Sequence, residues 1–389
     1  MLKHFDELDS LRGIAALSVV IDHFIMIFPN IALDTYDTGI NPVNVIKYSP
    51  LHVFWAGTEA VVLFFLLSGL VLSLPFINGK TQTYPSFMTK RFFRIYPAYI
   101  CAVLLGMVMR SLLYHGKINE LSSWFNSVWT NPFSFHALLD HVLLIVSFPN
   151  GNFVPVLWSL VHEMRISILF PLLMIMIIKF NSKQNIIIGL ILSLSGFILT
   201  ILFNISNDYV LSLQFIIMFI TGALIAKHMS YLVERYSSLP RAIKFIIFIF
   251  GICLYTFKWN LHYIPVNKSV LFLKMYNVLS LDFIKYWAMT VGASIFIIAS
   301  LSAGTFSRIL RQGIPRYLGK ISYSLYLFHS IVLMSFIHIL YGIISIWAIL
   351  LIAFVVSLIL ATISYYFIEK PFIGLGKKAA NILLNKKSL

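Results

Sequence analysis

Long apolar runs constrain this chain more than any other feature of its sequence. Leu, Ile, Val and Phe recur in blocks of about twenty residues, the length that an α-helix needs to cross a bilayer. Hydrophobic residues fill 59% of the 389 positions and charged residues only 11%, which leaves no stretch long enough for a separate soluble domain. The predicted fold class is all-α, a polytopic membrane helical bundle with about ten transmembrane helices. The expected spans are roughly 8–28, 54–77, 95–114, 157–178, 185–203, 211–228, 243–259, 286–302, 321–341 and 344–368.

The positions of Lys and Arg predict that both termini are cytoplasmic. Alternate connections between the expected spans carry most of the basic residues, as the positive-inside rule requires. One lysine cluster at 258–285 departs from this pattern, so it faces an anionic outer ligand or marks a miscounted helix. The net charge of +15 follows from the same topology, and no nucleic-acid partner is expected. We expect a transmembrane domain over 1–375 and a basic cytoplasmic tail over 376–389, in the inner (cytoplasmic) membrane of the cell.

Several familiar site types are missing from the sequence. The first apolar segment carries charged residues and no small-residue cleavage site, so a cleavable signal peptide is not expected. Cys101 and Cys253 lie in apolar runs and indicate neither a disulfide framework nor a metal site. No phosphate-binding P-loop, Gly-x-Ser-x-Gly elbow or His-x-x-x-His pair occurs. Asp34 and Asp37 are not the paired-acid loop of a lipid-linked sugar glycosyltransferase.

The two long outer connections, 29–53 and 115–156, are rich in Asn, Pro, Tyr, Trp and His. Within the second, the apolar stretch 138–148 is too short to span a bilayer, so an interfacial or re-entrant helix is expected there.

Arg12 and His23 are ionisable residues inside the first apolar run, where such groups are energetically costly and usually functional. Eleven residues at about 100° each place both on one helix face, roughly 16 Å apart along the axis. Taken alone, Arg12 could snorkel to the inner surface and His23 could be a hydrogen-bonded core residue. Together they favour anion binding at the surface and proton chemistry at depth. Asp9, one turn earlier, is expected to orient Arg12.

Arg91 and Arg94 lie three residues apart at the expected inner mouth of the third span. Two guanidinium forks on one side suit phosphate groups. Ordinary topology signalling is the alternative, and anion binding is favoured because Arg12 is expected at the same surface.

Glu163 follows Trp158 and Ser159 at the outer entry of the fourth span. A buried carboxylate needs a partner, and that partner is expected on another helix. Pairing with His23 would fix the tautomer of the imidazole and strengthen it as a base. A purely structural Glu–Arg tie is the alternative.

A polar stripe is expected on a later span, where Ser322, Tyr326 and His329 fall at i, i+4 and i+7. Interhelical hydrogen bonding accounts for the first two, and His329 is a candidate for contact with the acceptor.

The second span opens with Glu59, which is expected near the outer surface as an acceptor contact. Ser68 and Gly69 in the same span are expected to support close helix packing. At the other end of the chain, Pro371 is expected to stop the last span and Glu369 to anchor it at the inner interface.

Taken together, these segments resemble the acyltransferase-3 family over nearly the whole chain. The similarity rests on the order and spacing of six motifs. They are the Leu-Arg-Gly-Ile-Ala-Ala-Leu opening with Arg12 and His23, residues 63–69 (Leu-Phe-Phe-Leu-Leu-Ser-Gly), Arg91-x-x-Arg94-Ile-Tyr-Pro, Trp158-Ser-Leu-x-x-Glu163 with Phe170-Pro171, Ser322-Tyr-Ser-Leu-Tyr-Leu-x-His329, and Glu369-Lys-Pro-Phe.

The resemblance implies ten core helices, a cytoplasmic acyl-CoA donor and an acceptor at the outer face. It also implies a catalytic role for His23, phosphate binding by Arg12, Arg91 and Arg94, and support of the active centre by Glu163. Many relatives continue the Trp-Ser-Leu motif with a second Glu and then Gln. Here Met164 and Arg165 stand there and His162 replaces an apolar residue, which leaves the identity of the acceptor open.

The resulting hypothesis is an integral membrane O-acyltransferase, most simply an O-acetyltransferase acting on a cell-surface carbohydrate or its lipid-linked precursor. Acyl-CoA (acetyl-CoA) is expected as co-substrate, with no tightly bound cofactor, no metal, and membrane lipids as the surroundings. Arg12, Arg91 and Arg94 at the inner surface are expected to share one tunnel through the helical bundle with His23. Both direct transfer and a covalent acyl-enzyme intermediate are compatible with the sequence. The candidate substrate contacts are Glu59, Trp158, Ser159, Tyr326 and His329. A transporter or flippase of a glycan or acyl carrier, with His and Glu as a proton relay, is the alternative.

Overall fold

Helices form the ordered structure of the chain. The structure, a computed structural model, describes residues 5–32, 42–79, 82–130, 135–146, 151–203, 208–261 and 281–385, and no β-strand occurs in these ranges. Within the same ranges, eight helices are long and apolar enough to cross a membrane, which confirms a polytopic helical membrane protein. They are Gly57–Ile77, Tyr84–Leu113, Leu157–Lys179, Ser182–Thr200, Tyr209–Lys227, Asp282–Leu301, Gly313–Leu340 and Ile346–Leu384.

Two of the ten expected spans are not among these eight. Helix α1 (Asp6–Ile25) has 20 residues, but its charged residues make it more polar than a typical span. The expected span 243–259 is divided into α11 (Arg241–Tyr255) and the single turn α12 (Phe257–Asn260). The 15 residues of α11 extend only about 22 Å, less than the roughly 30 Å of a hydrocarbon core. The count of ten is therefore not confirmed.

Helix α5 (Tyr84–Leu113) begins eleven residues before the expected start at 95. Thr83 caps it by accepting the backbone N–H of Ser86, and a proline occupies its first turn. The first turns of α5 are polar, so the apolar pattern did not predict them as part of the helix. Arg91 and Arg94 consequently lie within a helix rather than at its mouth.

The prediction that Pro371 ends the last span is wrong. Helix α17 (Ile346–Ser364) continues through a π-helical segment, η4 (Tyr365–Glu369), into α18 (Lys370–Asn385). Pro371 stands in the first turn of α18, where a missing N–H is tolerated, and the wider π turn precedes it. Glu369 is buried rather than exposed at an interface.

The chain forms two compact units, and α1, α7 (Leu157–Lys179) and α16 (Gly313–Leu340) each contribute to both. Unit 1 comprises Met1–Val19, Asp34–Asn78 and Leu172–Gly319. Its remaining helices are α3 (Pro42–Lys47), η1 (Pro50–Trp55), α4 (Gly57–Ile77), α8 (Ser182–Phe203), α9 (Asp208–Lys227), α10 (Met229–Ser238), α11, α12, α14 (Asp282–Leu301) and α15 (Thr305–Leu310).

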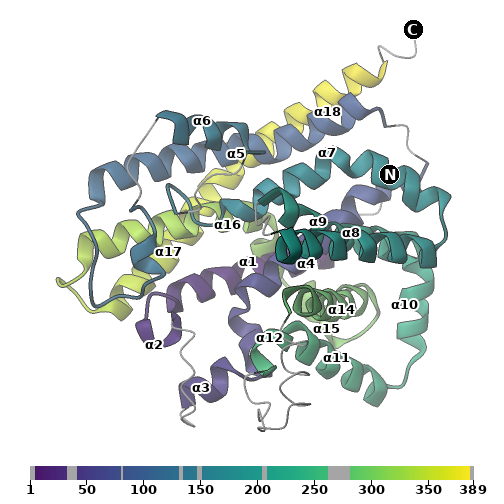
Figure 1. The fold of residues 1–389 in the computed structure, drawn as a ribbon, viewed down its shortest axis with the longest axis horizontal. Helices are drawn as coiled ribbons and strands as arrows, with labels where there is room; N and C mark the ends of the chain where they lie inside the picture. The colour runs from purple at the N-terminus through teal and green to yellow at the C-terminus, as the bar shows by residue number, and fades with distance from the viewer. Residues whose placement is uncertain are drawn as a thin grey trace. The chain divides into compact units, whose positions relative to one another are not determined.

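Small residues allow close helix packing within unit 1. A Cβ atom on Gly69 of α4 would collide with the backbone of Phe219 in α9, and one on Gly222 would collide with the backbone of Leu66. The close packing expected at Gly69 is therefore confirmed. Helices α8 and α9 also lie side by side (Figure 1).

Unit 2 comprises Val20–Leu33, Gly79–Pro171 and Lys320–Leu389. Helices α5 and α18 lie side by side along its edge (Figure 1), and a Cβ atom on Gly376 would meet the ring of Phe93. The short helix expected at 138–148 is present as α6, shifted a few residues earlier. The remaining elements are α2 (Pro29–Ala32), η2 (Phe125–Ser127), α6 (Phe135–Leu143), α17, η4 and α18.

Candidate active site

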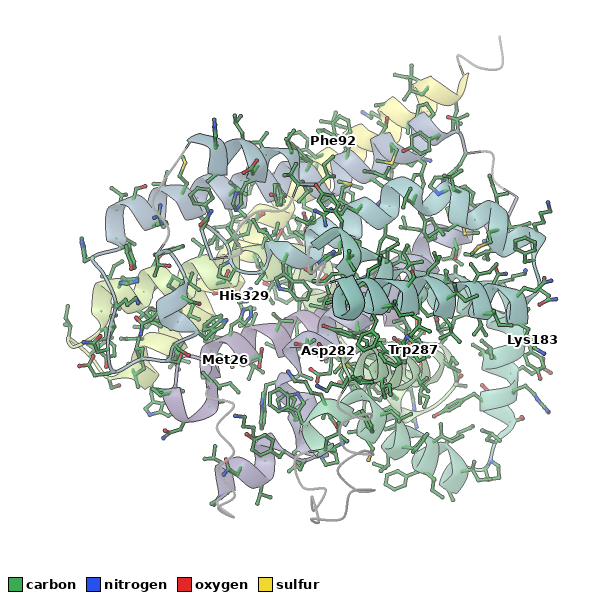
Figure 2. The ribbon with its side chains drawn as sticks, viewed as in Figure 1. Met26, Phe92, Lys183, Asp282, Trp287 and His329 are labelled. Atoms are coloured by element: carbon green, nitrogen blue, oxygen red, sulfur yellow. The ribbon has the colours of Figure 1, made fainter. Side chains whose placement is uncertain are left out.

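Two histidines form a hydrogen-bonded pair inside unit 2. His23, in the last turn of α1, lies 2.9 Å from His329 of α16, measured from Nδ1 to Nε2. The ring planes are inclined by only 19°, and His329 is labelled on its helix in Figure 2. His329 is fully buried, whereas His23 is half-buried.

A contact with a backbone carbonyl determines which ring nitrogens of this histidine pair carry protons. His329 Nδ1 lies 2.9 Å from the carbonyl oxygen of Leu325, and a carbonyl can only accept, so Nδ1 carries the proton. In a neutral ring Nε2 is then an acceptor, and His23 must donate from its own Nδ1. His23 Nε2 is left with a lone pair. The pair therefore presents one basic nitrogen, held in orientation by the helix behind it.

A tryptophan that the sequence did not single out lies against the same imidazole. The rings of Trp124 and His23 have centroids 5.0 Å apart and planes inclined by 27°. Trp124 belongs to the connection between α5 and α6. The only signal in the sequence was that this connection is rich in aromatic and polar residues. That composition does not single out Trp124 from the other residues of the connection.

Arg91 and Glu163 form an ion pair between α5 and α7. Arg91 Nη2 lies 2.8 Å from Glu163 Oε1 and donates at 2.8 Å to the hydroxyl of Ser167. The structure thus pairs Glu163 with Arg91, the Glu–Arg tie that was the alternative, and pairs His23 with His329 in place of the expected Glu163. A guanidinium compensates a carboxylate in a poorly solvated site better than a neutral imidazole does. The partner does come from another helix, as expected.

Arg94 has a different environment three residues later. Its Nη1 lies 2.8 Å from Oε1 of the buried Glu369, whose Oε2 accepts from Ser324 at 3.0 Å. The Arg94 side chain is 40% exposed, against 11% for Arg91. Arg94 is therefore the more accessible of the two for a phosphate.

Three further candidates of unit 2 lie near the start of α7. Ser159 Oγ and Tyr326 Oη are 2.6 Å apart, and both hydroxyls contact the carbonyl of Val156. Ser159 and Tyr326 are buried, and Trp158 is half-buried with its ring edge-on to His162. Ser322 is buried on the same stripe of α16 as Tyr326 and His329.

Arg12 lies in unit 1 and is held by its own helix and by α4. It contacts Asp9 at 3.2 Å, which confirms the expected pair, and donates to the carbonyl of Leu67 at 3.2 Å. Ser68, next to that carbonyl, is buried. Arg12 and His23 share helix α1, and a common tunnel stays a prediction.

In unit 1, the buried imidazole of His52 of η1 lies near Glu59. The His52 ring stacks on Trp259 with centroids 4.0 Å apart, and Trp259 Nε1 donates at 3.0 Å to Glu59 Oε1. Burial lowers the pKa of His52 to about 3. A weak contact with the backbone of Lys47 opposes this in part, and the positive charges of Lys258 and Lys47 lower the pKa further. Glu59 is fully buried.

Some predictions cannot be placed. Lys268 and Lys274 of the outer lysine cluster, and Asp34 and Asp37, lie outside the described residues. No group of three or more His, Cys, Asp or Glu that could hold a metal ion occurs in the described ranges.

Comparison with known proteins identifies the family. The family model described as an acyltransferase domain, of the acyltransferase-3 type, matches residues 5–366. No curated protein and no solved structure matches the chain. The match covers nearly the whole chain, so the chain belongs to this family and is a multi-pass membrane acyltransferase.

Proposed function

We propose that this member of the acyltransferase-3 family moves an acyl group, most simply acetyl, from cytoplasmic acyl-CoA to a carbohydrate hydroxyl. The acceptor is a cell-surface glycan or its lipid-linked precursor, and the enzyme lies in the cytoplasmic membrane with both termini inside. Family membership favours acyl transfer over the transporter alternative, because it is an enzymatic family.

The observation that carries the proposal is the proton arrangement of the His23–His329 pair. His23 Nε2 removes the proton from the acceptor hydroxyl while its oxygen attacks the thioester carbonyl. The carbon–sulfur bond breaks, the carbon–oxygen bond forms, and the departing thiolate takes up the proton from His23. During the step His23 is an imidazolium whose Nδ1–H is shared with His329, so the charge is partly delocalised over a hydrogen bond.

The arginines divide into two roles in this proposal. Arg94, the more exposed, contacts the phosphates of the donor and keeps its ion pair with Glu369. Arg91 holds Glu163 and ties α5 to α7 near the site. Arg12 stays a candidate for the donor as well, with Asp9 as its orienting partner.

The remaining polar residues are candidates for the acceptor. Ser159 and Tyr326 present neighbouring hydroxyls, and Trp158 offers an aromatic ring close by in the sequence. Glu59 is a further candidate, whose carboxylate accepts from Trp259 Nε1.

The test is acyl transfer by the purified protein in detergent or nanodiscs. Radiolabelled acetyl-CoA is supplied with methyl glycosides, and both consumed donor and acetylated glycoside are counted. The expected result is stoichiometric transfer that His23→Ala abolishes while the variant still accumulates in membranes. Uptake of a glycan without consumption of acetyl-CoA would support transport instead. Comparing surface-glycan mass between a deletion strain and its parent then identifies the natural acceptor, as a shift of one acyl unit per sugar.

A further inference from the structure

The loop that follows α5 brings Trp124 onto a face of the His23 ring. A centroid separation of 5.0 Å and an inclination of 27° are typical of an offset aromatic stack. His329 bonds the ring edge at Nδ1, so Trp124 and His329 meet different parts of the same imidazole. A stacking partner covers a ring face and leaves the Nε2 edge open for a hydroxyl.

This loop is fixed to the end of α1 by hydrogen bonds. The backbone N–H of Ser122 donates to the carbonyl of Ile27 at 2.9 Å, and its hydroxyl donates to the carbonyl of Met26 at 2.7 Å. Met26, labelled in Figure 2, comes directly after the last turn of α1 that carries His23. These bonds satisfy the carbonyls of the two residues that directly follow α1.

A second set of bonds stiffens the loop itself. Asn126 donates from Nδ2 to the carbonyl of Ile118 at 2.8 Å and accepts the N–H of Ile118 at 2.9 Å. The same Nδ2 also contacts the carbonyls of Leu121 and Ser122. Trp124 is thus held from both sides at a defined position beside His23.

The loop that carries Trp124 also carries exposed residue types that bind sugars. Trp124 is half-buried, and Asn119, Glu120 and Ser123 of the same loop are exposed. An indole offers an apolar surface for the C–H groups of a pyranose ring, while amide, carboxylate and hydroxyl groups serve its hydroxyls.

We propose that Trp124 is a specificity-determining residue that holds the pyranose ring of the carbohydrate acceptor next to His23 Nε2, on the part of the indole that the smaller, offset imidazole leaves uncovered. The inference rests on the proposed function and names a residue through which the acceptor is recognised. It predicts that Trp124 acts on acceptor binding and leaves the thioester chemistry of His23 in place.

The test uses the purified full-length protein and two probes, methyl glucoside and methyl N-acetylglucosaminide. Acetyl transfer to each glycoside is measured together with acetyl-CoA hydrolysis in the absence of glycoside. Trp124→Ala is expected to raise the acceptor KM roughly tenfold, the worth of one aromatic stacking contact. Hydrolysis and the KM for acetyl-CoA are expected to change less than about twofold, and Trp124→Phe to keep most of the acceptor affinity.

Trp347→Ala is the matched control. Trp347 lies in the same unit, is exposed, and its ring contacts Phe28 instead of His23. Its removal is expected to leave both KM values unchanged. If Trp124→Ala does not accumulate, Trp124→Phe and Trp124→His are compared, and equal acceptor KM values in these two and the wild type overturn the inference.

The outcomes separate this inference from the function on which it rests. Wild-type transfer combined with an unchanged acceptor KM in Trp124→Ala overturns the inference alone. An equal fall in hydrolysis and transfer at unchanged acceptor KM also overturns it, because Trp124 would then only position His23. Failure of the wild type to acetylate either glycoside overturns the proposed acceptor class and this inference together.

Discussion

Each unit holds an imidazole stacked on a tryptophan, His23 on Trp124 in unit 2 and His52 on Trp259 in unit 1, and of these two His23 is the one arranged as a base. In unit 2, His23 donates a hydrogen bond from Nδ1 to His329 Nε2, and His329 in turn donates from its own Nδ1 to the carbonyl of Leu325. In unit 1, His52 stacks on Trp259, and neither of its ring nitrogens has a hydrogen-bond partner of good geometry among the described residues.

The difference shows what makes a histidine useful in a poorly solvated site. A base needs one nitrogen committed to an acceptor, so that the imidazolium formed in the reaction is stabilised, and one nitrogen open to substrate. Among the described residues, His52 has no acceptor at good hydrogen-bond geometry, and the positive charges of Lys258 and Lys47 act on its ring. Burial together with these charges keeps the pKa of His52 near 3, so its ring stays neutral in the physiological range.

The largest expected effect separates the two histidines directly. His23→Ala is expected to lower kcat for acetyl transfer by about 10²- to 10⁴-fold, the usual contribution of a general base. His52→Gln, the matched change in unit 1, is expected to leave kcat within about threefold. Both are measured with radiolabelled acetyl-CoA at equal protein content in membranes. Comparable losses of kcat in the two variants would contradict the assignment of His23, rather than His52, as the general base.

The role of His329 is tested by side chains that reproduce one ring nitrogen at a time. Glutamine extends far enough to place an acceptor oxygen near the position of Nε2, whereas asparagine reaches only the position of Nδ1. His329→Gln is expected to keep kcat within roughly tenfold, and His329→Asn to lose about a hundredfold, because only the first can accept from His23. Equal activity in the two variants would show that His23 needs no acceptor.

The sequence predicted the helices better than the contacts between them. Apolar runs fixed most spans to within a few residues, because lipid requires each span to satisfy its backbone internally. The polar start of α5 and the passage of the helix through Pro371 were missed, since hydropathy reports burial in lipid and not helix continuity.

Side-chain contacts between different helices could not be predicted from the sequence for a related reason. Spacing along one helix predicted the Asp9–Arg12 contact, which is local. Nothing in the spacing relates α1 to α16, so the His23–His329 bond and the stack on Trp124 came only from tertiary structure.

Two arginines in the unit of His23 also have different predicted roles. Arg94→Lys keeps a charge for Glu369 but loses the planar fork, so it is expected to raise the KM for acetyl-CoA about tenfold. Arg91→Lys is the matched control, expected to leave that KM within about twofold, since the more buried Arg91 is engaged by Glu163. Initial rates over a range of acetyl-CoA concentrations give the KM of each variant. A larger KM increase in the Arg91 variant would reverse the proposed roles.

The smallest expected effect is on stability, and it tests the lowered pKa of His52. Its pKa is about 3 in the folded protein, against 6.5 as the ordinary value, so the folded state resists protonation. Above pH 6.5 neither state binds the proton and His52 has no effect. As the pH falls below 6.5, only the unfolded state takes up the proton, and the free energy of unfolding drops by about 1.4 kcal/mol per pH unit until about pH 3. The thermal midpoint of the wild type in detergent should therefore fall more between pH 7.5 and 5.5 than that of His52→Gln. Equal shifts in the two proteins would mean that His52 titrates normally, and the two imidazoles would then differ in their neighbours but not in their chemistry.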